Sequence, residues 1–457
     1  MKKINLLPFP YVKPESFLIK ICNYPFSFLM NIFWNRHERY TLCGFSPFLI
    51  FKSKKRKIEI IDENNRRIEI NGDPIEEFQK IFDNFKIKSE NFFVPGGIGF
   101  LSYDLAWQIE NLPQIAVDDL LLPDIFVCFY KSIFVFDEVK KKSFLITVDH
   151  KKNKTLTILN EQKKISYGEF CDYNLRTLKS NMTYSYYIRA IEKIKNYIKE
   201  GDVYQINFSH RFQIDGNFDP FQLFLRLKKV NPAPYSAYFN CENFFLISNS
   251  PELFLKKEKD KIITKPMKGT RKRMLSREED IKVARELLKS EKDRAELIMI
   301  VDLERNDLGK ICEYGSVRVK KLINLERYKT VYQTTSIVEG KLKKNIKLKD
   351  VLKAMFPGGS ITGAPKKRAI EIIEEVEPTK RNFYTGCFGY FGFNGNLQLN
   401  ILIRTVLLKN KTLYYPVGGG IVWDSIPEKE YEETLIKAKN LFLTIGIKED
   451  EIRETNF

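Results

Sequence analysis

The run Pro357-Gly358-Gly359-Ser360-Ile361-Thr362-Gly363-Ala364-Pro365-Lys366 interrupts the regular pattern of the chain. Its prolines and glycines end the preceding segment, and a helix is predicted directly after it, around Lys366–Val376. The run is not a P-loop, because its lysine follows a proline and no serine or threonine comes after that lysine. Its small residues would let backbone amides approach an anionic ligand closely. A plain turn is the alternative interpretation of such a run taken alone.

A second glycine-rich run, Val417-Gly418-Gly419-Gly420-Ile421-Val422, precedes the last predicted long helix, over about 427–443. Glu430, Glu433 and Lys437 have the spacing i, i+3, i+7 and therefore form a stripe along one side of that helix. The glycines would accept an anion in the same way as those of the first run. A plain turn is again the alternative.

Another predicted helix, over about 290–305, carries Asp293 and Glu296 three residues apart and so on one face. Two acidic helices that face each other would form a carboxylate cage for Mg²⁺, which typically uses one or two carboxylates with waters and an anionic substrate group. Taken alone, each acidic pair is more often a solvated helix face. The metal prediction therefore depends on the combination with the glycine runs.

The run Thr264-Lys265-Pro266-Met267-Lys268-Gly269-Thr270-Arg271 places a lysine before a glycine. By residue type alone, Lys268 is more often a solvated lysine than a catalytic one. A nucleophilic lysine needs a neutral amine and hence a partly desolvated site, which a sequence does not reveal.

The order of predicted elements favours an α+β fold with large antiparallel sheets, because strands and helices interleave without the regular rhythm of a parallel sheet. From Ile4 to about Val148 the chain is mostly strand-like, with a helix predicted near 75–85. A helical period runs from Thr183 to Gly201, and Ser276 with Glu279 forms a capping-box signature for a helix ending at about Leu288.

Three regions are predicted along the 457 residues. They are an N-terminal region, 1–150, a polar connector without a clear period, 151–182, and a C-terminal region, 183–445, interleaved in one compact fold.

The formal net charge of +18 invites a polyanion-binding interpretation. The lysines, however, are spread along the whole chain, and the densest basic run, 52–57, lies between two strand-like segments and predicts a solvated hairpin turn. We therefore expect no nucleic-acid partner. No apolar run approaches the roughly 20 residues that span a bilayer, so a cytoplasmic protein without membrane contact is expected. The seven cysteines lie far apart without a CxxC pair, which predicts reduced, mostly structural thiols.

Together, these runs resemble the chorismate-utilising enzymes, the family of anthranilate synthase component I, aminodeoxychorismate synthase component I and the isochorismate and salicylate synthases. The resemblance covers about Thr183 to Leu443 and is weaker in the N-terminal half, where residues 39–47 are the best match. It implies an α/β/β/α layered sandwich. The segments that carry it are Gly-Asp-Val-Tyr-Gln-Ile-Asn-Phe-Ser (201–209), Asn-Pro-Ala-Pro-Tyr-Ser-Ala-Tyr (231–238), Ser-Pro-Glu (250–252), Val-Asp-Leu-Glu-Arg-Asn-Asp-Leu-Gly (301–309), Gly-Gly-Ser-Ile-Thr-Gly-Ala-Pro-Lys (358–366), Ile-Arg-Thr (403–405) and Glu-Tyr-Glu-Glu-Thr (430–434).

The resemblance also implies roles for individual residues. Glu296, Glu430 and Glu433 correspond to Mg²⁺ ligands, with Asp293 at the position of another, and the metal would bind the ring carboxylate of chorismate. Glu252 corresponds to the general acid that protonates the departing 4-hydroxyl, a task that requires a raised pKa. The residues implied in substrate binding are Arg404, Lys437, Tyr384, Ser360, Thr270, Gly418 and Gly419.

Two positions distinguish the activities of the family. Isochorismate and salicylate synthases carry a water-activating lysine at the position of Gln205, so water addition is not expected here. Aminodeoxychorismate synthases resemble this chain at Lys268, where anthranilate synthases usually carry alanine. The resemblance thus implies amination of chorismate to 4-amino-4-deoxychorismate, on the route to p-aminobenzoate and folate, through a covalent intermediate on Lys268.

The chain departs from the family pattern at Gln333, which occupies a position that is commonly histidine and cannot titrate as histidine does. No Cys-His-Glu glutaminase motif is present, so a separate glutamine amidotransferase subunit is the expected source of ammonia. Anthranilate synthase component I is the nearest alternative, although no clear Leu-Leu-Glu-Ser inhibitor motif appears near 28–39. A non-catalytic polyanion-binding protein is the alternative from another class, but it predicts losses among the acidic and basic site residues, which are all present.

Overall fold

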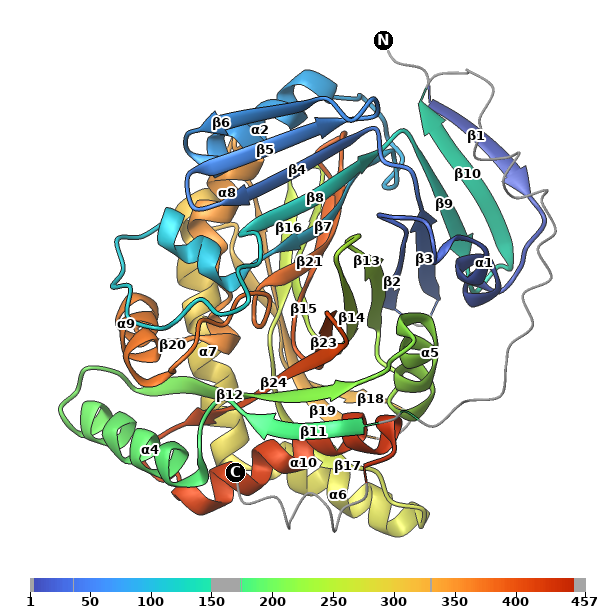
Figure 1. Cartoon of the computed structure of the whole chain (residues 1–457). Coiled ribbons are helices and arrows are strands. Elements are labelled where there is room, and N and C mark those ends of the chain that lie inside the picture. The colour runs from blue at the N-terminus through green and yellow to red at the C-terminus, as the bar shows by residue number, and fades with distance from the viewer. Residues whose placement is uncertain (1–3, 36, 149–172, 174, 329–330, 448–457) are drawn as a thin grey trace.

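The computed structural model describes residues 4–35, 37–148, 173, 175–328 and 331–447 (Figure 1). Within these residues, two 12-stranded sheets in which every strand pair is antiparallel dominate the fold. In their order across the first sheet, the strands are β1 (Ile4–Phe9), β10 (Lys142–Val148), β9 (Ser132–Asp137), β3 (Glu38–Gly44), β2 (Phe28–Asn35), β13 (Tyr235–Asn240), β14 (Phe244–Ser250), β23 (Thr405–Lys409), β24 (Thr412–Ile421), β12 (Gln205–Gly216) and β11 (Leu175–Ser180), with β20 (Gly363–Ala364) paired to β12.

The second sheet has the same antiparallel character. In order, its strands are β17 (Met267–Lys272), β19 (Val331–Lys341), β16 (Lys261–Lys265), β15 (Leu253–Glu258), β22 (Leu397–Ile401), β21 (Cys387–Gly392), β7 (Gly96–Leu101), β8 (Ile125–Tyr130), β4 (Leu49–Lys54), β5 (Lys57–Asp62) and β6 (Arg67–Asn71), with β18 (Arg318–Arg327) paired to β19. Both sheets therefore contain strands from the N-terminal and the C-terminal part of the sequence.

Helices cover the outer faces of the two sheets (Figure 1). They are α1 (Pro14–Ile21), α2 (Pro74–Phe85), α4 (Tyr184–Lys199), α5 (Pro220–Val230), α6 (Arg277–Lys289), α7 (Glu291–Ile311), α8 (Leu348–Met355), α9 (Lys366–Val376) and α10 (Pro427–Ile445), with the short 3-10 turns η1 (Tyr103–Gln108) and η2 (Gly359–Ile361).

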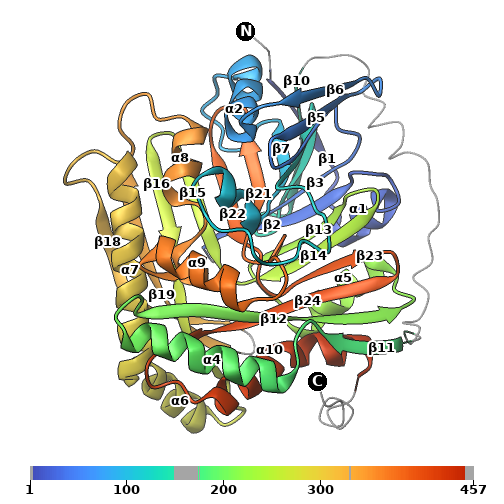
Figure 2. The same cartoon turned by 60° about the vertical axis from the view of Figure 1, so that its left-hand side comes forward.

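The apolar core has layers that follow from this arrangement. Helices α1, α5 and α10 pack on the first sheet, and α2, α7 and α8 pack on the second. A cluster that includes Phe28, Leu42, Phe100 and Phe126 lies where the two sheets face each other. Helices α4 and α9 pack against β12 at one end of the first sheet (Figure 2). The predicted α+β architecture with large antiparallel sheets is confirmed, and its layers follow the order α/β/β/α.

Most predicted helices occupy the expected residues. Helix α9 has the predicted bounds, and α10 begins at the predicted proline. Helix α7 is longer than expected and ends at Ile311. Helix α6 begins after Ser276, but the Ser276 side chain forms no capping hydrogen bond, so the predicted capping box is wrong even though the helix is present.

The predicted connector and the basic run have different outcomes. Residues 151–172 and 174 of the connector lie outside the described residues, whereas Leu175–Ser180 forms strand β11, which pairs with β12. The basic run 52–57 joins the antiparallel strands β4 and β5, which confirms the predicted hairpin.

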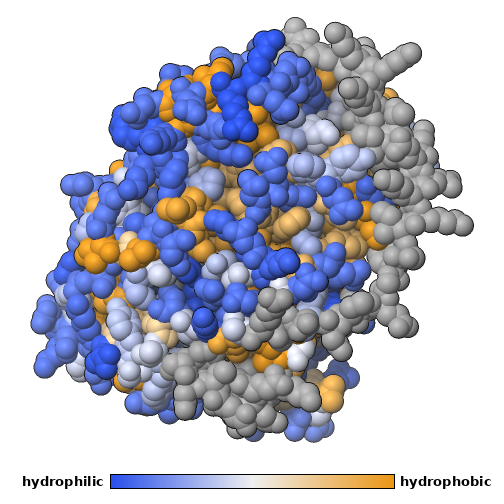
Figure 3. Space-filling view, in the orientation of Figure 1, coloured by the Kyte–Doolittle hydropathy of each residue, from blue (hydrophilic) through white to orange (hydrophobic). Residues whose placement is uncertain are grey.

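The remaining sequence predictions concern the surface and the cysteines. Hydrophilic side chains cover most of the face shown in Figure 3, and hydrophobic ones gather mainly across its middle. Among the described residues, no helix is both long and apolar enough to cross a membrane. The six described cysteines are free and buried, as expected of structural thiols, and Cys171 lies outside the described residues.

Candidate active site

The glycine run of β24 forms the floor on which most predicted site residues meet. A Cβ atom built on Gly420 would lie 2.3 Å from Gln205 Nε2 and 3.2 Å from Lys268 Nζ. One built on Gly419 would lie 3.5 Å from Glu430 Oε2 and 3.7 Å from Lys437 Nζ. A side chain at either position would extend into the space between these groups, and at Gly420 it would force Gln205 to shift.

The first glycine of the run, Gly418, lies against β12 and Tyr384. A Cβ atom there would lie 2.6 Å from the Phe208 carbonyl oxygen and 3.1 Å from Tyr384 Oη. The Gly418 carbonyl accepts a hydrogen bond from Lys437 Nζ at 2.8 Å. Residues from β12, β17, β24 and α10 and the loop before β21 thus surround one short strand segment.

Lys268 projects from β17 and is largely withdrawn from solvent. Its Nζ lies 3.5 Å from Glu296 Oε2 of α7, with side-chain exposures of 13% and 14%. Its carbonyl oxygen accepts a hydrogen bond from the Thr334 hydroxyl of the neighbouring strand β19. Lys268 is therefore held in a mostly enclosed position beside the glycine run by an opposite charge and by the neighbouring strand.

Glu252 follows the end of β14 and is only 4% exposed. Burial raises its pKa to about 7, while a hydrogen bond from Ser360 and the charge of Lys268 act in the opposite direction. Ser360 lies in the η2 turn, and its hydroxyl donates that bond to Glu252 Oε1 over a distance of 2.6 Å. A carboxyl group that keeps its proton near neutral pH can act as a general acid.

The acidic stripe of α10 meets the glycine floor. Glu430 is buried and accepts a hydrogen bond from Ser425 Oγ at 2.7 Å. Burial raises the pKa of Glu430, and the negative charge of Glu433 raises it further. The hydrogen bond from Ser425 acts in the opposite direction. Burial of Glu433 acts to raise its pKa. The ion pair of 2.6 Å with Lys437 outweighs this effect, so the pKa of Glu433 is lowered.

The donor chemistry of this stripe fits a divalent cation. A cation would relieve the crowding of Glu430 by Glu433, and carboxylate oxygens are the ligands that Mg²⁺ prefers. In the described part of the chain, however, no three potential ligand side chains converge on one point. Glu296 is instead paired with Lys268, and Lys292 of α7 lies 4.0 Å from Glu430.

Asp293 points to a different set of partners from the other predicted acids. Its carboxylate forms an ion pair of 2.9 Å with Arg271. A Cβ atom on Gly269, whose φ of +70° favours glycine, would lie 2.9 Å from Asp293 Cγ. Asp293 therefore braces the segment that follows Lys268, and its role as a metal ligand stays a prediction.

Arg404 and Thr270, two further predicted substrate-binding residues, have other neighbours. Arg404 lies between β22 and β23, and burial lowers its pKa while Tyr415 and Tyr328 act against that shift. Arg404 is partly buried, and no carboxylate among the described residues forms an ion pair with its guanidinium, so its role in binding a substrate carboxylate stays a prediction. The Thr270 hydroxyl accepts a hydrogen bond from Gln333 Nε2 at 3.2 Å.

Gln333, which stands where the sequence resemblance implies histidine, orients the Thr270 hydroxyl through this hydrogen bond. Its Oε1 atom is buried and has no hydrogen-bond partner within the described residues. The same holds for Gln205 Oε1 and Thr335 Oγ1. Such unsatisfied buried atoms are costly unless a ligand or water satisfies them.

Glu304 is a buried acid of the site that the sequence predictions missed. It is 2% exposed, accepts a hydrogen bond from the Gly359 amide at 3.0 Å, and burial raises its pKa to about 7. The sequence carried a signal for it, because Glu304 continues the buried helical row of Leu297, Val301 and Leu308. A charged residue in an apolar row indicates a buried polar site.

Three comparisons relate this geometry to known proteins. A family model described as chorismate binding enzyme matches residues 31–442. Aminodeoxychorismate synthase component 1 of Bacillus subtilis (strain 168) is 39% identical over 431 residues, which cover 92% of each chain. Anthranilate synthase component 1 of Acetivibrio thermocellus is 36% identical over 429 residues, which cover 89% of this chain and 87% of that protein.

A solved structure agrees with these relatives. The crystal structure of anthranilate synthase component I from Streptococcus pneumoniae TIGR4 matches with a TM-score of 0.79 and 31% sequence identity, over 90% of this chain and 93% of that one. Both synthase types occur among the similar proteins, so the comparisons establish the family and leave the product open. The chain belongs to the family of chorismate binding enzymes.

Proposed function

We propose that this chain is the synthase component that converts chorismate and ammonia to 4-amino-4-deoxychorismate. The observation that carries the proposal is the position of Lys268, whose amine lies beside both the glycine floor and Glu296. Anthranilate synthases usually have alanine at this position, so the lysine favours amination at ring carbon 4. The similarity to aminodeoxychorismate synthase component 1 of Bacillus subtilis supports the same choice.

In the proposed reaction, the neutral amine of Lys268 forms a bond to ring carbon 2 of chorismate. The ring double bonds shift, and the 4-hydroxyl leaves as water with the proton that Glu252 donates. Ammonia then bonds to carbon 4, the double bonds shift back, and the bond between carbon 2 and the lysine nitrogen breaks. Two allylic substitutions replace one difficult displacement, and the enolpyruvyl group stays on the product.

The cationic residues of the site suit a substrate with two carboxylates. Arg404 offers a planar guanidinium that can bind a carboxylate with two parallel hydrogen bonds. Lys437 offers an ammonium group next to the backbone of Gly418. Glu296, Glu430 and Glu433, with Asp293, would hold Mg²⁺, which supplies charge neutralisation for the ring carboxylate. We propose a separate glutamine amidotransferase subunit as the source of ammonia.

Product analysis tests the proposal. Purified protein is incubated with chorismate, Mg²⁺ and ammonium, and the products are identified by mass spectrometry. We expect aminodeoxychorismate from the unmodified protein and none from Lys268→Ala. Anthranilate from the unmodified protein would overturn the proposal and favour anthranilate synthesis instead.

A matched lysine provides the control. Lys265 lies three residues earlier, at the end of β16, and also pairs with a carboxylate, Glu326, at 2.7 Å. Lys265→Ala removes a comparable ion pair near the same sheet edge, so it should retain turnover. Equal losses in both variants would mean that the effect of Lys268→Ala is structural.

A further inference from the structure

We propose that Arg381, held by Glu377, is the positioning residue that aligns three separate segments of the active site. The inference rests on the proposed function only for the identity of the reaction, because the contacts themselves are independent of the product. Arg381 lies in the loop between α9 and β21 and is 5% exposed, while Glu377, which directly follows α9, is 4% exposed.

The two side chains form a bidentate pair. Arg381 Nε donates to Glu377 Oε2 at 2.9 Å, and Nη2 donates to Glu377 Oε1 at 2.7 Å. The guanidinium is also 4.8 Å from the centre of the Tyr103 ring. A paired, buried guanidinium of this kind is a rigid fork with hydrogen-bond donors to spare.

The spare donors reach the three segments that carry the site. Arg381 Nη1 donates to the Ile361 carbonyl at 2.9 Å and to Thr385 Oγ1 at 3.3 Å, and Nη2 donates to the Asn207 carbonyl. Ile361 directly follows Ser360, whose hydroxyl holds Glu252. Thr385 directly follows Tyr384, and Asn207 pairs with Gly420 between β12 and β24.

Glu377 extends the same connection to the glycine floor. Its Oε1 atom accepts hydrogen bonds from the Ser209 amide at 2.9 Å and from the Ser209 hydroxyl at 2.8 Å. Ser209 is the β12 partner of Gly418. One buried ion pair therefore fixes the general-acid turn, the Tyr384 segment and the glycine strand relative to one another.

The η2 turn is held from both ends. The Gly359 amide donates to Glu304 at its start, and the Ile361 carbonyl accepts from Arg381 at its end. Ser360 lies between these two anchors and donates to Glu252. Loss of the Arg381 anchor would free the turn and weaken the hydrogen bond from Ser360, which acts to lower the pKa of Glu252.

Arg211 provides a matched comparison because it is a buried arginine on β12, the strand whose Asn207 carbonyl accepts a hydrogen bond from Arg381. It is 6% exposed and pairs with Asp119, and its guanidinium lies 5.2 Å from the centre of the Tyr414 ring. Its described side-chain contacts lie at the loop before β8 and on the outer part of β24 rather than at η2. If the fold merely required a buried arginine in this region, replacing either residue would have the same effect.

The test compares Arg381→Lys with Arg211→Lys, Ser360→Ala and the double variant of Arg381 and Ser360. Lysine keeps the positive charge beside Glu377 but cannot reproduce the planar fork. The readouts are kcat and KM, followed as loss of chorismate, and the ionisation of Glu252. The ionisation of Glu252 is followed by infrared spectroscopy. Its carboxyl signal is identified as the one that disappears when the Glu252→Gln substitution is introduced into each variant.

We expect Arg381→Lys to lower kcat roughly 10- to 100-fold, as a displaced site does, with a smaller change in KM. The pKa of Glu252 should rise above its value of about 7, as it should in Ser360→Ala. The charges that face Glu252, Lys268 from β17 and Glu304 from α7, are the same in all variants. Once the Ser360 hydroxyl is absent, Arg381→Lys should cause no further rise.

An unchanged kcat and an unchanged Glu252 pKa in Arg381→Lys would overturn the proposal, as would equal effects in Arg211→Lys. If Arg381→Lys does not fold, Glu377→Gln loosens the same guanidinium and should raise the Glu252 pKa in the same direction. The infrared titration needs no turnover. A wrong product in the unmodified protein would therefore refute the proposed reaction without affecting the result for Arg381.

Discussion

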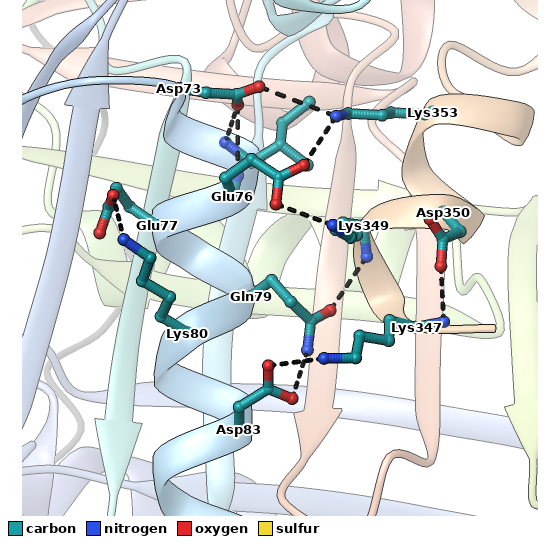
Figure 4. A network of polar contacts seen from close by, with 11 residues as sticks. Asp73, Glu76, Glu77, Gln79, Lys80, Asp83, Lys347, Lys349, Asp350 and Lys353 are labelled. Atoms are coloured by element: carbon teal, nitrogen blue, oxygen red, sulfur yellow. Dashed lines mark hydrogen bonds and ion pairs between the residues drawn. The ribbon is translucent and has the colours of Figure 1, made fainter. Parts of the chain in front are cut away.

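Two regions of the molecule use the same charged residue types in opposite surroundings. On the surface, α2 and α8 are joined by ion pairs in which Glu76 accepts from Lys349 at 2.9 Å and from Lys353 at 3.0 Å (Figure 4). The side chains there are 31–40% exposed. In the interior, Arg381 and Glu377 form one pair at 2% and 4% side-chain exposure.

The difference shows what burial adds to an ion pair. The α2–α8 contacts form several alternatives, since Lys353 also lies 3.7 Å from Asp73, and Lys347 pairs with Asp83 at 3.0 Å (Figure 4). Water can replace any of them, so exposed pairs contribute little. The Arg381–Glu377 pair has no such alternative, because unpaired charges are costly where water is excluded. The buried pair therefore fixes the relative positions of the segments that it joins, whereas each exposed pair between α2 and α8 contributes only a little to stability.

The largest effect should come from a buried charge that acts on the substrate. Glu252→Gln preserves the size of the side chain but removes the acidic proton, so chorismate turnover should fall about 10²- to 10⁴-fold. In the unmodified protein, turnover compared at a constant concentration of free ammonia should lose the contribution of the acid as the pH rises through about 7, because only protonated Glu252 can donate, and Glu252→Gln should lack this loss. Steady-state rates from pH 5.5 to 8.5 (roughly 1.5 units on either side of that pKa) measure both effects. A loss of less than tenfold would exclude Glu252 as the acid.

Breaking the two kinds of ion pair should sharpen the comparison directly. Glu377→Leu leaves the Arg381 charge buried and unpaired, so the free energy of unfolding should fall by about 3–5 kcal/mol. Glu76→Leu removes two exposed pairs and should cost roughly 1 kcal/mol or less. Urea unfolding of both variants measures the contrast. Equal losses would show that burial does not decide the contribution of these pairs.

Stability should also depend on pH through Glu304. Burial raises its folded-state pKa from 4.5 to about 7. Its protonated form therefore stabilises the fold fully below about pH 4.5, and this contribution of about 3 kcal/mol is lost as the pH rises through about 7. Glu304→Gln should remove that decline. Urea midpoints at roughly pH 5 and pH 8 for both proteins test it, and parallel curves would contradict it.

The smallest effects should come from replacing single lysines in the exposed ion pairs between α2 and α8. Lys349→Met and Lys353→Met should each lower the free energy of unfolding by about 0.2–1 kcal/mol. The loss should shrink in about 1 M salt, because screening already weakens these pairs. Lys80→Met, which removes an i,i+3 pair with Glu77 within α2, is the control for the contacts between helices. A loss that does not respond to salt would point to packing instead.

Local sequence patterns predicted the positions of most helices, but not how strands distant in sequence pair with one another. The period of α9 and the proline of α10 gave the helix positions, because amphipathic spacing and helix starts are local properties. The sequence did not reveal that β11 begins at Leu175, since a polar edge strand has no apolar alternation to mark it. The pairing order of strands far apart in sequence also required the structure.

The same distinction holds for the site. Lys268, Glu252, Ser360 and the glycine run were predicted from residue types and a resemblance, and the structure brings them together. Arg381 was not predicted. Its side-chain donors bind backbone carbonyl oxygens, and a carbonyl leaves no trace in the identity of its residue. The ion pairs of Glu296 with Lys268 and of Asp293 with Arg271 were equally invisible in sequence, whereas the pair of Glu433 with Lys437 has the i,i+4 spacing of neighbours on a helix.

The mixed origin of the two sheets has a consequence for how the chain folds. Strand β7 pairs with β21 through Gly96 and Gly392, and β2 pairs with β13 through Phe28 and Phe239. During synthesis, the early strands must wait with unpaired edges until their distant partners emerge. Such non-local pairing slows folding and exposes edges that favour aggregation. We expect the N-terminal half expressed alone to be insoluble and the whole chain to refold slowly.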